Sequence, residues 1–157
     1  MKHITHNGLH LLLPALVLFT FLFGQIAEAA DFAVIVNAGN DYQAAETEMK
    51  TTVKRLFLKE AGSWPNNIDA EPIDRAQGSA EQQAFMSQVL NLDAAALARH
   101  WMAVKQKTGQ TAPREVSAGS IVLKLIGSKK GAFAVVDTAS LGGLPGNARI
   151  LFQFSAP

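Results

Sequence analysis

The chain is a succession of short apolar runs separated by polar turns, and the spacing of the apolar positions differs from run to run. Four short runs predict β-strands, and three of them are rich in β-branched or aromatic residues. Their ranges are Asp31–Asn37, Ile68–Asp74, Gly131–Asp137 and Ala148–Phe154. Pro72 lies inside the second run. Because proline cannot donate to a sheet ladder, that run is expected near a sheet edge or at a strand start.

Between these runs, apolar residues recur at three- and four-residue steps, which predicts amphipathic helices. Their ranges are Thr47–Ala61, Ser79–Leu90, Asp93–Gly109 and the shorter Ser117–Ser128, which Gly119 weakens. Gly62 and Pro65 are expected to end the first helix, and Asp93 and Gly109 to cap the two ends of the third.

Alternating strands and helices indicate an α/β layer architecture. We expect Phe32–Asn37, Gly131–Val136 and Ala148–Phe154 to share one sheet, with the helices Thr47–Ala61 and Asp93–Thr108 packed on it. The predicted core residues are Leu56, Phe57, Phe85, Leu97, Trp101 and Val104.

The first 29 residues are typical of a secretory signal peptide. Lys2 supplies a positive start, Leu11–Phe23 is an apolar core, and Ala27 and Ala29 form a small-x-small cleavage site. The apolar run is shorter than the roughly 20 residues that span a membrane. Cleavage after Ala29 would leave 157 − 29 = 128 residues, a single domain over 30–157 with no membrane span. An uncleaved N-terminal anchor is the alternative.

Composition excludes several classes of function. The chain contains no cysteine, so disulfides and thiolate metal sites are ruled out. Its net charge is +1, far from the strongly basic balance of a nucleic-acid-binding protein. Export without disulfides suggests a soluble periplasmic protein.

The segment Ile73–Phe85 combines an arginine, a Gly-Ser step and the start of a helix. Ser79 and Gln82 have the Ser-x-x-Gln spacing of a capping box, in which the two side chains satisfy backbone N–H groups at the helix start. The same segment also suits an anion. A helix N-terminus attracts negative charge, Gly78 allows close approach of the backbone, and Arg75 can form paired hydrogen bonds to phosphate-like oxygens.

Three blocks resemble the phosphate-binding proteins of ABC-type transporters and their short relatives. "LFLKEAGSWPNN" is similar to the "IFLG…WPDG" segment of that family, and "RAQGSAEQQAF" to its R-x-D-G-S-G-T…F phosphate loop. "REVSAGSIVLKLIGSKKGAFAVVD" resembles the following "pGAIGYv" block. The resemblance spans about 32–137. It implies an α/β fold, a single lobe of a type 2 periplasmic-binding-protein-like domain with a mixed sheet flanked by helices.

The resemblance also implies a ligand site, with the residues Arg75, Gln77, Gly78, Ser79 and Ala80. The family pattern has aspartate, glycine and threonine where this chain has Gln77, Ala80 and Glu81. Glu81 replaces a hydroxyl donor by a carboxylate, which repels an anion bound at the same helix start.

Other chemistry-bearing residues support neither catalysis nor a metal site. His100 is the one histidine after the predicted signal peptide and has no companion ligands. Ser79 is not in a Gly-x-Ser-x-Gly pattern, and no pair of carboxylates has a catalytic spacing. Trp64 is expected to be a packing anchor. We expect no enzyme activity, no cofactor and no metal.

Two functions remain open. One is a ligand-binding module that binds phosphate or another oxyanion weakly, strengthened by a self-dimer or a second protein. The other is an envelope interaction module that keeps the fold without the ligand, as a partner of a transporter, an outer-membrane protein or a sensor.

Overall fold

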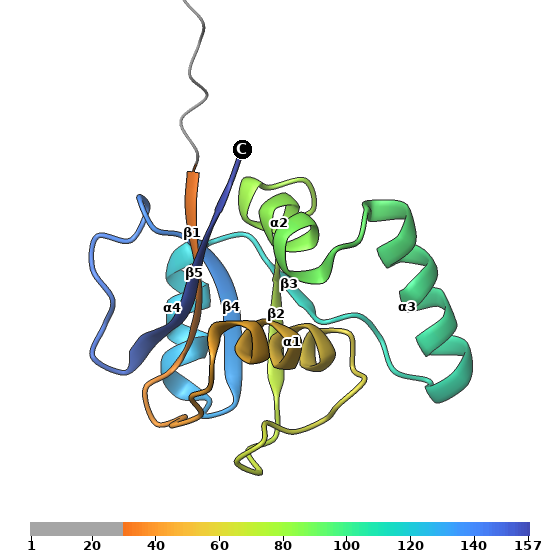
Figure 1. Ribbon diagram of the computed structural model, residues 1–157, viewed down its shortest axis with the longest axis horizontal. Helices are drawn as coiled ribbons and strands as arrows, with labels where there is room; N and C mark the ends of the chain where they lie inside the picture. The colour runs from red at the N-terminus through yellow and green to blue at the C-terminus, as the bar shows by residue number, and fades with distance from the viewer. Residues whose placement is uncertain (1–29) are drawn as a thin grey trace, which may run out of the picture.

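The computed structural model describes residues 30–157 (Figure 1). The predicted signal peptide lies outside the described residues. Five strands form one sheet in the order β3-β2-β4-β1-β5. Strand β2 runs parallel to β3 and β4, whereas β1 runs antiparallel to both β4 and β5. The strands are β1 (Ala30–Asn37), β2 (Glu71–Arg75), β3 (Arg114–Val116), β4 (Ala132–Asp137) and β5 (Ala148–Ala156).

The helices lie on both faces of this mixed sheet, as predicted (Figure 1). One face is covered by α1 and α2 with its continuation, and the other by α4. The helices are α1 (Glu46–Phe57), α2 (Ala80–Phe85) with a π-helical turn (Met86–Leu90), α3 (Ala94–Thr108) and α4 (Gly119–Ser128). No helix in the range 30–157 is long and apolar enough to cross a membrane.

Strand β1, which lies between β4 and β5, shows why its sequence is apolar without interruption. Phe32 and Val34 belong to the core on the α1 and α2 face, while Ala33 and Ile35 belong to the core on the α4 face. Successive side chains of a strand point to opposite faces, so a strand covered on both faces needs apolar residues at every position. The predicted sheet of three strands is confirmed.

Helix α1 ends earlier than predicted, at Phe57 instead of Ala61. Lys59 adopts a left-handed conformation with φ 58°. Its N–H donates to Leu56 O at 3.2 Å, and Glu60 N–H donates to Arg55 O at 2.8 Å. These two bonds form a Schellman motif, which satisfies the last carbonyls and ends the helix before Gly62 is reached.

Helix α3 does not pack on the sheet as predicted but lies to its side (Figure 1). Leu97 is its one buried residue, and Trp101 is half-buried against Phe57, with 6.1 Å between the ring centroids. Val104 is also half-buried, so its assignment to the core was wrong. The helix touches the rest of the domain mainly through its first half, and the second half of its apolar stripe faces solvent in part.

Trp64 is a packing anchor. It is 1% exposed, its ring packs edge-on against Phe133, and its indole N–H donates to Gly131 O at 3.0 Å. Gly131 is required there, because an added Cβ would overlap the backbone oxygen of Asp69. The hydrogen bond from Trp64 to Gly131 O fixes the loop before β2 against the start of β4, and so fixes the position of β2.

Candidate functional site

The predicted anion loop follows the carboxyl end of β2, where the chain turns into α2. Gly78 has φ 78°, a conformation that favours glycine, and it is exposed. Gln77 and Ala80 are exposed beside it, and Ser79 is half-buried. The structure therefore brings these four predicted residues together in one tight, accessible turn.

Ser79 is the N-cap of α2, as predicted. Its side-chain oxygen accepts the Gln82 N–H at 3.3 Å. The second half of the capping box differs from the expected form, because Gln82 Oε1 accepts the N–H of Gly78 at 2.8 Å and not that of Ser79. The Ser79 N–H instead donates to Ala76 O at 3.0 Å within the turn.

These bonds reduce the number of backbone donors that an anion could use. The N–H groups of Gly78 and Ser79 already have acceptors in the chain. Within residues 30–157, no acceptor receives the N–H groups of Ala80 and Glu81, which begin the helix. Two donors therefore remain free at this helix start.

Arg75 points into the protein and not into the open turn. Its residue is 6% exposed, and its Nη1 donates to Val116 O at 2.9 Å. Its Nη2 forms an ion pair with Glu81 Oε1 at 2.8 Å, between side chains that are 7% and 17% exposed. The guanidinium that the sequence suggested for an external anion is thus bound to a carboxylate of the same chain.

One donor of this arginine stays unsatisfied. Arg75 Nε is buried and has no hydrogen-bond acceptor among the described residues. Buried donors normally find a partner, so an orphaned guanidinium N–H is a local cost that the rest of the ion pair offsets. The Val116 contact has no signal in the sequence, because β3 has only three residues and two of them are exposed.

Asp74, the residue before Arg75 on β2, is bonded to the backbone of Arg75 and to Gln82 of α2. Asp74 Oδ1 accepts the N–H of Arg75 at 2.8 Å, and its Oδ2 accepts from Gln82 Nε2 at 3.3 Å. Burial raises the pKa of Asp74 above its usual value, and the two hydrogen bonds only partly oppose this. Neither residue belongs to the ligand site that the sequence predicts.

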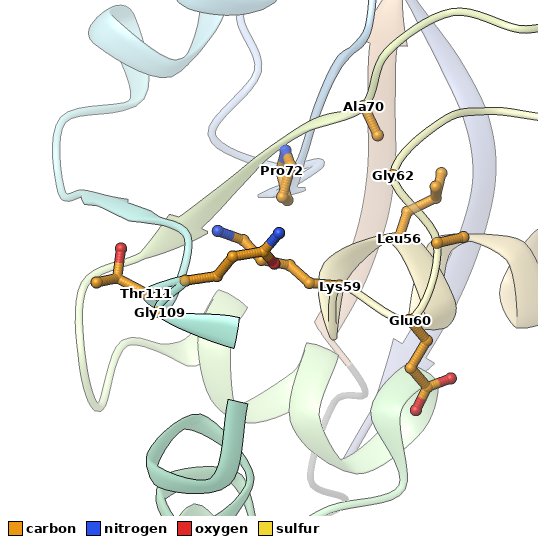
Figure 2. Close-up of a pocket in the computed structure, with 10 residues that line it drawn as sticks. Leu56, Lys59, Glu60, Gly62, Ala70, Pro72, Gly109 and Thr111 are labelled. Atoms are coloured by element: carbon orange, nitrogen blue, oxygen red, sulfur yellow. The ribbon is translucent and has the colours of Figure 1, made fainter. Parts of the chain in front are cut away.

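A second cleft lies at the opposite end of β2 (Figure 2). It has a volume of about 520 Å³ and is lined by the end of α1, the start of β2 and the segment after α3. Lys59 and Glu60 are its charged residues, and the Glu60 side chain points away from Ala70 and Pro72. The charges of this cleft do not converge on one point, so it is a weaker candidate than the loop after β2.

The remaining polar candidates are structural. His100 Nε2 lies 2.9 Å from Leu58 O and so ties α3 to the end of α1. Groups of histidine and carboxylate side chains that could hold a metal ion are absent from the described part of the chain.

Comparison with solved structures identifies the architecture. An ABC-type phosphate transport receptor from Vibrio cholerae aligns with a TM-score of 0.53 and 14% identity, over 78% of this chain and 46% of the receptor. A putative phosphate ABC transporter substrate-binding protein with bound phosphate, from Clostridium perfringens, aligns with a TM-score of 0.54 and 12% identity. That alignment covers 78% of this chain and 44% of the other. The chain has the fold of these substrate-binding proteins.

The likeness to these two proteins is confined to the fold. The chain spans less than half the length of either protein that it matches. No family model and no curated protein matches the sequence. The periplasmic-binding-protein-like fold is therefore established, and the function has to be argued from the residues of this chain.

Proposed function

We propose that this chain is an exported phosphate ABC transporter substrate-binding-protein-like domain that has lost tight phosphate binding and acts by binding another protein of the cell envelope. The observation that carries this proposal is the ion pair between Arg75 and Glu81 at 2.8 Å. In this domain the negative charge that pairs with Arg75 at the helix start is Glu81 of the chain itself, and not a bound anion. No catalytic step is part of the proposal.

The electrostatics of the loop support the proposal. A phosphate at the start of α2 would lie close to the Glu81 carboxylate, and like charges at short distance oppose binding. To engage Arg75, the phosphate would also have to displace Glu81 from a pair that is largely shielded from water. Such a pair is costly to break, because it leaves one charge desolvated without its partner.

The exposure of the loop supports the proposal as well. Ligand sites commonly enclose most of the ligand surface. Here Gln77, Gly78 and Ala80 are exposed. A ligand on this turn would remain in contact with water unless a second protein, or a second copy of the chain, covered it. Partners of the kind expected from the sequence are a transporter, an outer-membrane protein or a sensor.

Weak oxyanion binding is the second candidate, and one observation favours it. The N–H groups of Ala80 and Glu81 are free at the helix start. In this version, phosphate or another oxyanion accepts these two N–H groups loosely at the exposed turn 77–80 while Arg75 stays paired.

Equilibrium dialysis of radiolabelled phosphate against the purified domain 30–157 separates the two candidates. The proposal predicts no retention at micromolar or millimolar phosphate, whereas the second candidate predicts weak, salt-sensitive retention at millimolar phosphate. Tight retention at micromolar phosphate would contradict both.

Two further measurements test the location and the partner. Mass spectrometry of the protein from the periplasmic fraction should show an N-terminus near Ala30, and an intact N-terminus would contradict export with cleavage. A photo-crosslinking residue at exposed Gln77 should yield an adduct with an envelope protein in cells. The same residue at exposed Glu48 on α1 serves as the control and should yield none.

A further inference from the structure

A small cavity lies next to the loop, on the side where α3 approaches the ends of β2 and β3. Its volume is about 200 Å³, below the roughly 300–1,000 Å³ of sites for drug-sized ligands. One wall carries the carboxylates of Asp74 and Glu115, and the opposite wall carries Leu97 and Trp101. The cavity is therefore sized for a single side chain or a small molecule, with an acidic wall facing an apolar one.

The two carboxylates are placed together by the sheet. Asp74 and Glu115 are register partners on the parallel strands β2 and β3, so their side chains leave the sheet on the same face. Neither forms a salt bridge within residues 30–157, and no lysine or arginine lines the cavity. Arg75 is a positive charge that acts on Asp74, and it is already bound to Glu81.

Charge is costly at this position. Burial raises the pKa of Asp74, and the neighbouring Glu115 adds to the effect. A positive group entering the cavity would remove this cost, because an opposite charge at close range favours the ionised carboxylate. An anion would increase it. The acidic wall therefore selects for a cation.

The opposite wall determines what kind of cation fits. Trp101, Leu97 and Met86 line it, and Trp101 is half-buried, so part of its indole remains open to the cavity. An indole ring attracts a cation over its face, and aliphatic side chains favour a methylene stem. A bare metal ion would gain no ligand from this aromatic and aliphatic wall. Within residues 30–157, no third carboxylate completes a set of metal ligands.

We propose that this cavity binds an organic cation, the guanidinium or ammonium group on the alkyl stem of an arginine or lysine side chain. The head group pairs with Asp74 and Glu115, and the stem lies against Trp101 and Leu97. The idea that a partner protein supplies this side chain rests on the proposed function. The cavity and its choice of a cation do not depend on it.

The test is a titration followed by NMR of the domain 30–157, with the indole N–H signal of Trp101 as the readout. The Trp101→Phe variant assigns that signal against the one from Trp64. The probe is acetyl-Gly-Arg-Gly-amide, and the matched control is the same peptide with citrulline, which has nearly the same shape without the charge. We expect the arginine peptide to shift the Trp101 signal, with a dissociation constant on the order of millimolar, and the citrulline peptide to bind more weakly.

Three variants locate the binding. Asp74→Asn and Glu115→Gln should each weaken the arginine peptide about two- to fivefold, the range of one partly exposed ion pair. Glu48→Gln removes an exposed carboxylate that does not line the cavity, and it should leave binding unchanged. Equal shifts with the two peptides, or equal affinity of Asp74→Asn and the wild type, would overturn the proposal.

Propylguanidinium, a free alkylguanidinium with the same single charge as the peptide, distinguishes the sources of the cation. Tighter binding of the peptide points to a protein side chain, and tighter binding of propylguanidinium points to a small free cation. No shift with any of these probes at tens of millimolar would refute the cation site itself. Tight phosphate binding by the wild type would refute the proposed function and leave this site standing, so the two failures can be told apart.

Discussion

Two arginines of this domain each connect separate segments of the chain, but they bond to different partners. Arg149, on the edge strand β5, donates from Nε and Nη2 to Asn40 O at 2.9 and 2.7 Å and from Nη2 to Tyr42 O at 2.7 Å. Arg75, on the inner strand β2, donates to one carbonyl, Val116 O, and pairs with Glu81. Arg149 therefore holds a loop through backbone carbonyls alone. Arg75 joins β3 and α2 through one carbonyl and one carboxylate.

The difference shows what an arginine beside a glycine-rich turn can mean. Burial lowers the pKa of Arg149, and the charge of Asp41 opposes the effect without a direct bond. Arg75 is more deeply buried and is compensated by a full negative charge. A buried guanidinium needs a counter-charge, which can come from a ligand or from the chain. In this protein the chain supplies it, and the sequence pattern around Arg75 alone does not distinguish the two cases.

The largest effect on stability is expected from Arg75→Ala. Removal of the guanidinium leaves Glu81 largely buried without its counter-charge, so the variant should lose about 2–4 kcal/mol of unfolding free energy. Urea denaturation measures this loss. The double variant Arg75→Ala/Glu81→Ala should recover part of it. A loss below about 0.5 kcal/mol would show that the ion pair is not structural.

Arg149→Ala should cost less, about 1–2 kcal/mol, because water can reach the half-exposed site and replace part of the lost hydrogen bonding. The effect should also be local. Amide hydrogen exchange should accelerate in residues 38–45, the loop that Arg149 holds, and much less around Val116. A larger loss of stability than in Arg75→Ala would reverse the proposed contrast between the two arginines.

Ser79→Ala should cost about 0.5–1 kcal/mol, the lower part of the range for N-caps, because its bond to the Gln82 N–H is long at 3.3 Å. Asp93→Ala is the matched control, since Asp93 caps α3 with a bond of 2.6 Å to the Ala96 N–H. Thermal or urea unfolding should therefore rank Asp93→Ala as the more costly change. The opposite ranking would assign Ser79 a role beyond capping.

The smallest effect concerns pH. The pKa of Asp74 is raised in the folded protein, so the folded state holds this proton more tightly than the unfolded state. The contribution of Asp74 to stability is therefore best below its unfolded pKa, and it is lost as the pH rises through the folded value. Asp74→Asn should be slightly more stable than the wild type at neutral pH, although it weakens the contact with Gln82. The gain should vanish at low pH, and melting temperatures measured from acid to neutral pH test this.

The sequence predicted what depends on local periodicity. The strands β1, β4 and β5 and the buried positions Leu56, Phe57, Phe85 and Leu97 follow from apolar spacing, and all are confirmed. The predicted cap Ser79 is confirmed as well, because a capping box is a local pattern.

The predictions that were wrong or missing concern contacts between segments that are distant in the sequence. The apolar stripe that includes Trp101 and Val104 is helical, but the spacing does not say how far along the helix the partner surface extends. Strand β3 has too few buried residues to produce a pattern. Lys59 ends α1 with a left-handed conformation, whereas the sequence assigned the end of this helix to Gly62 and Pro65.

The candidate site shows the same division. Its location at the start of α2 follows from the sequence, and so does the acidic residue Glu81 in the first turn. The pairing of Glu81 with Arg75 depends on how the strand, the turn and the helix are arranged in space, so no spacing in the sequence predicts it. The assignment of Arg75, Gln77, Gly78, Ser79 and Ala80 to a ligand stays a prediction.

We propose that Glu81 occupies the guanidinium that an anion would otherwise bind, and phosphate titration of the Glu81→Thr variant tests this. Calorimetry and thermal unfolding would compare this variant with the wild type and Arg75→Ala at low and moderate salt. Glu81→Thr should be less stable than the wild type without phosphate. Millimolar phosphate should raise its melting temperature, because ligand binding stabilises the folded state. Its affinity should exceed that of the wild type by about five- to a hundredfold, the equivalent of about 1–3 kcal/mol, and Arg75→Ala should not respond. Phosphate binding by the wild type that equals or exceeds that of Glu81→Thr would contradict this claim.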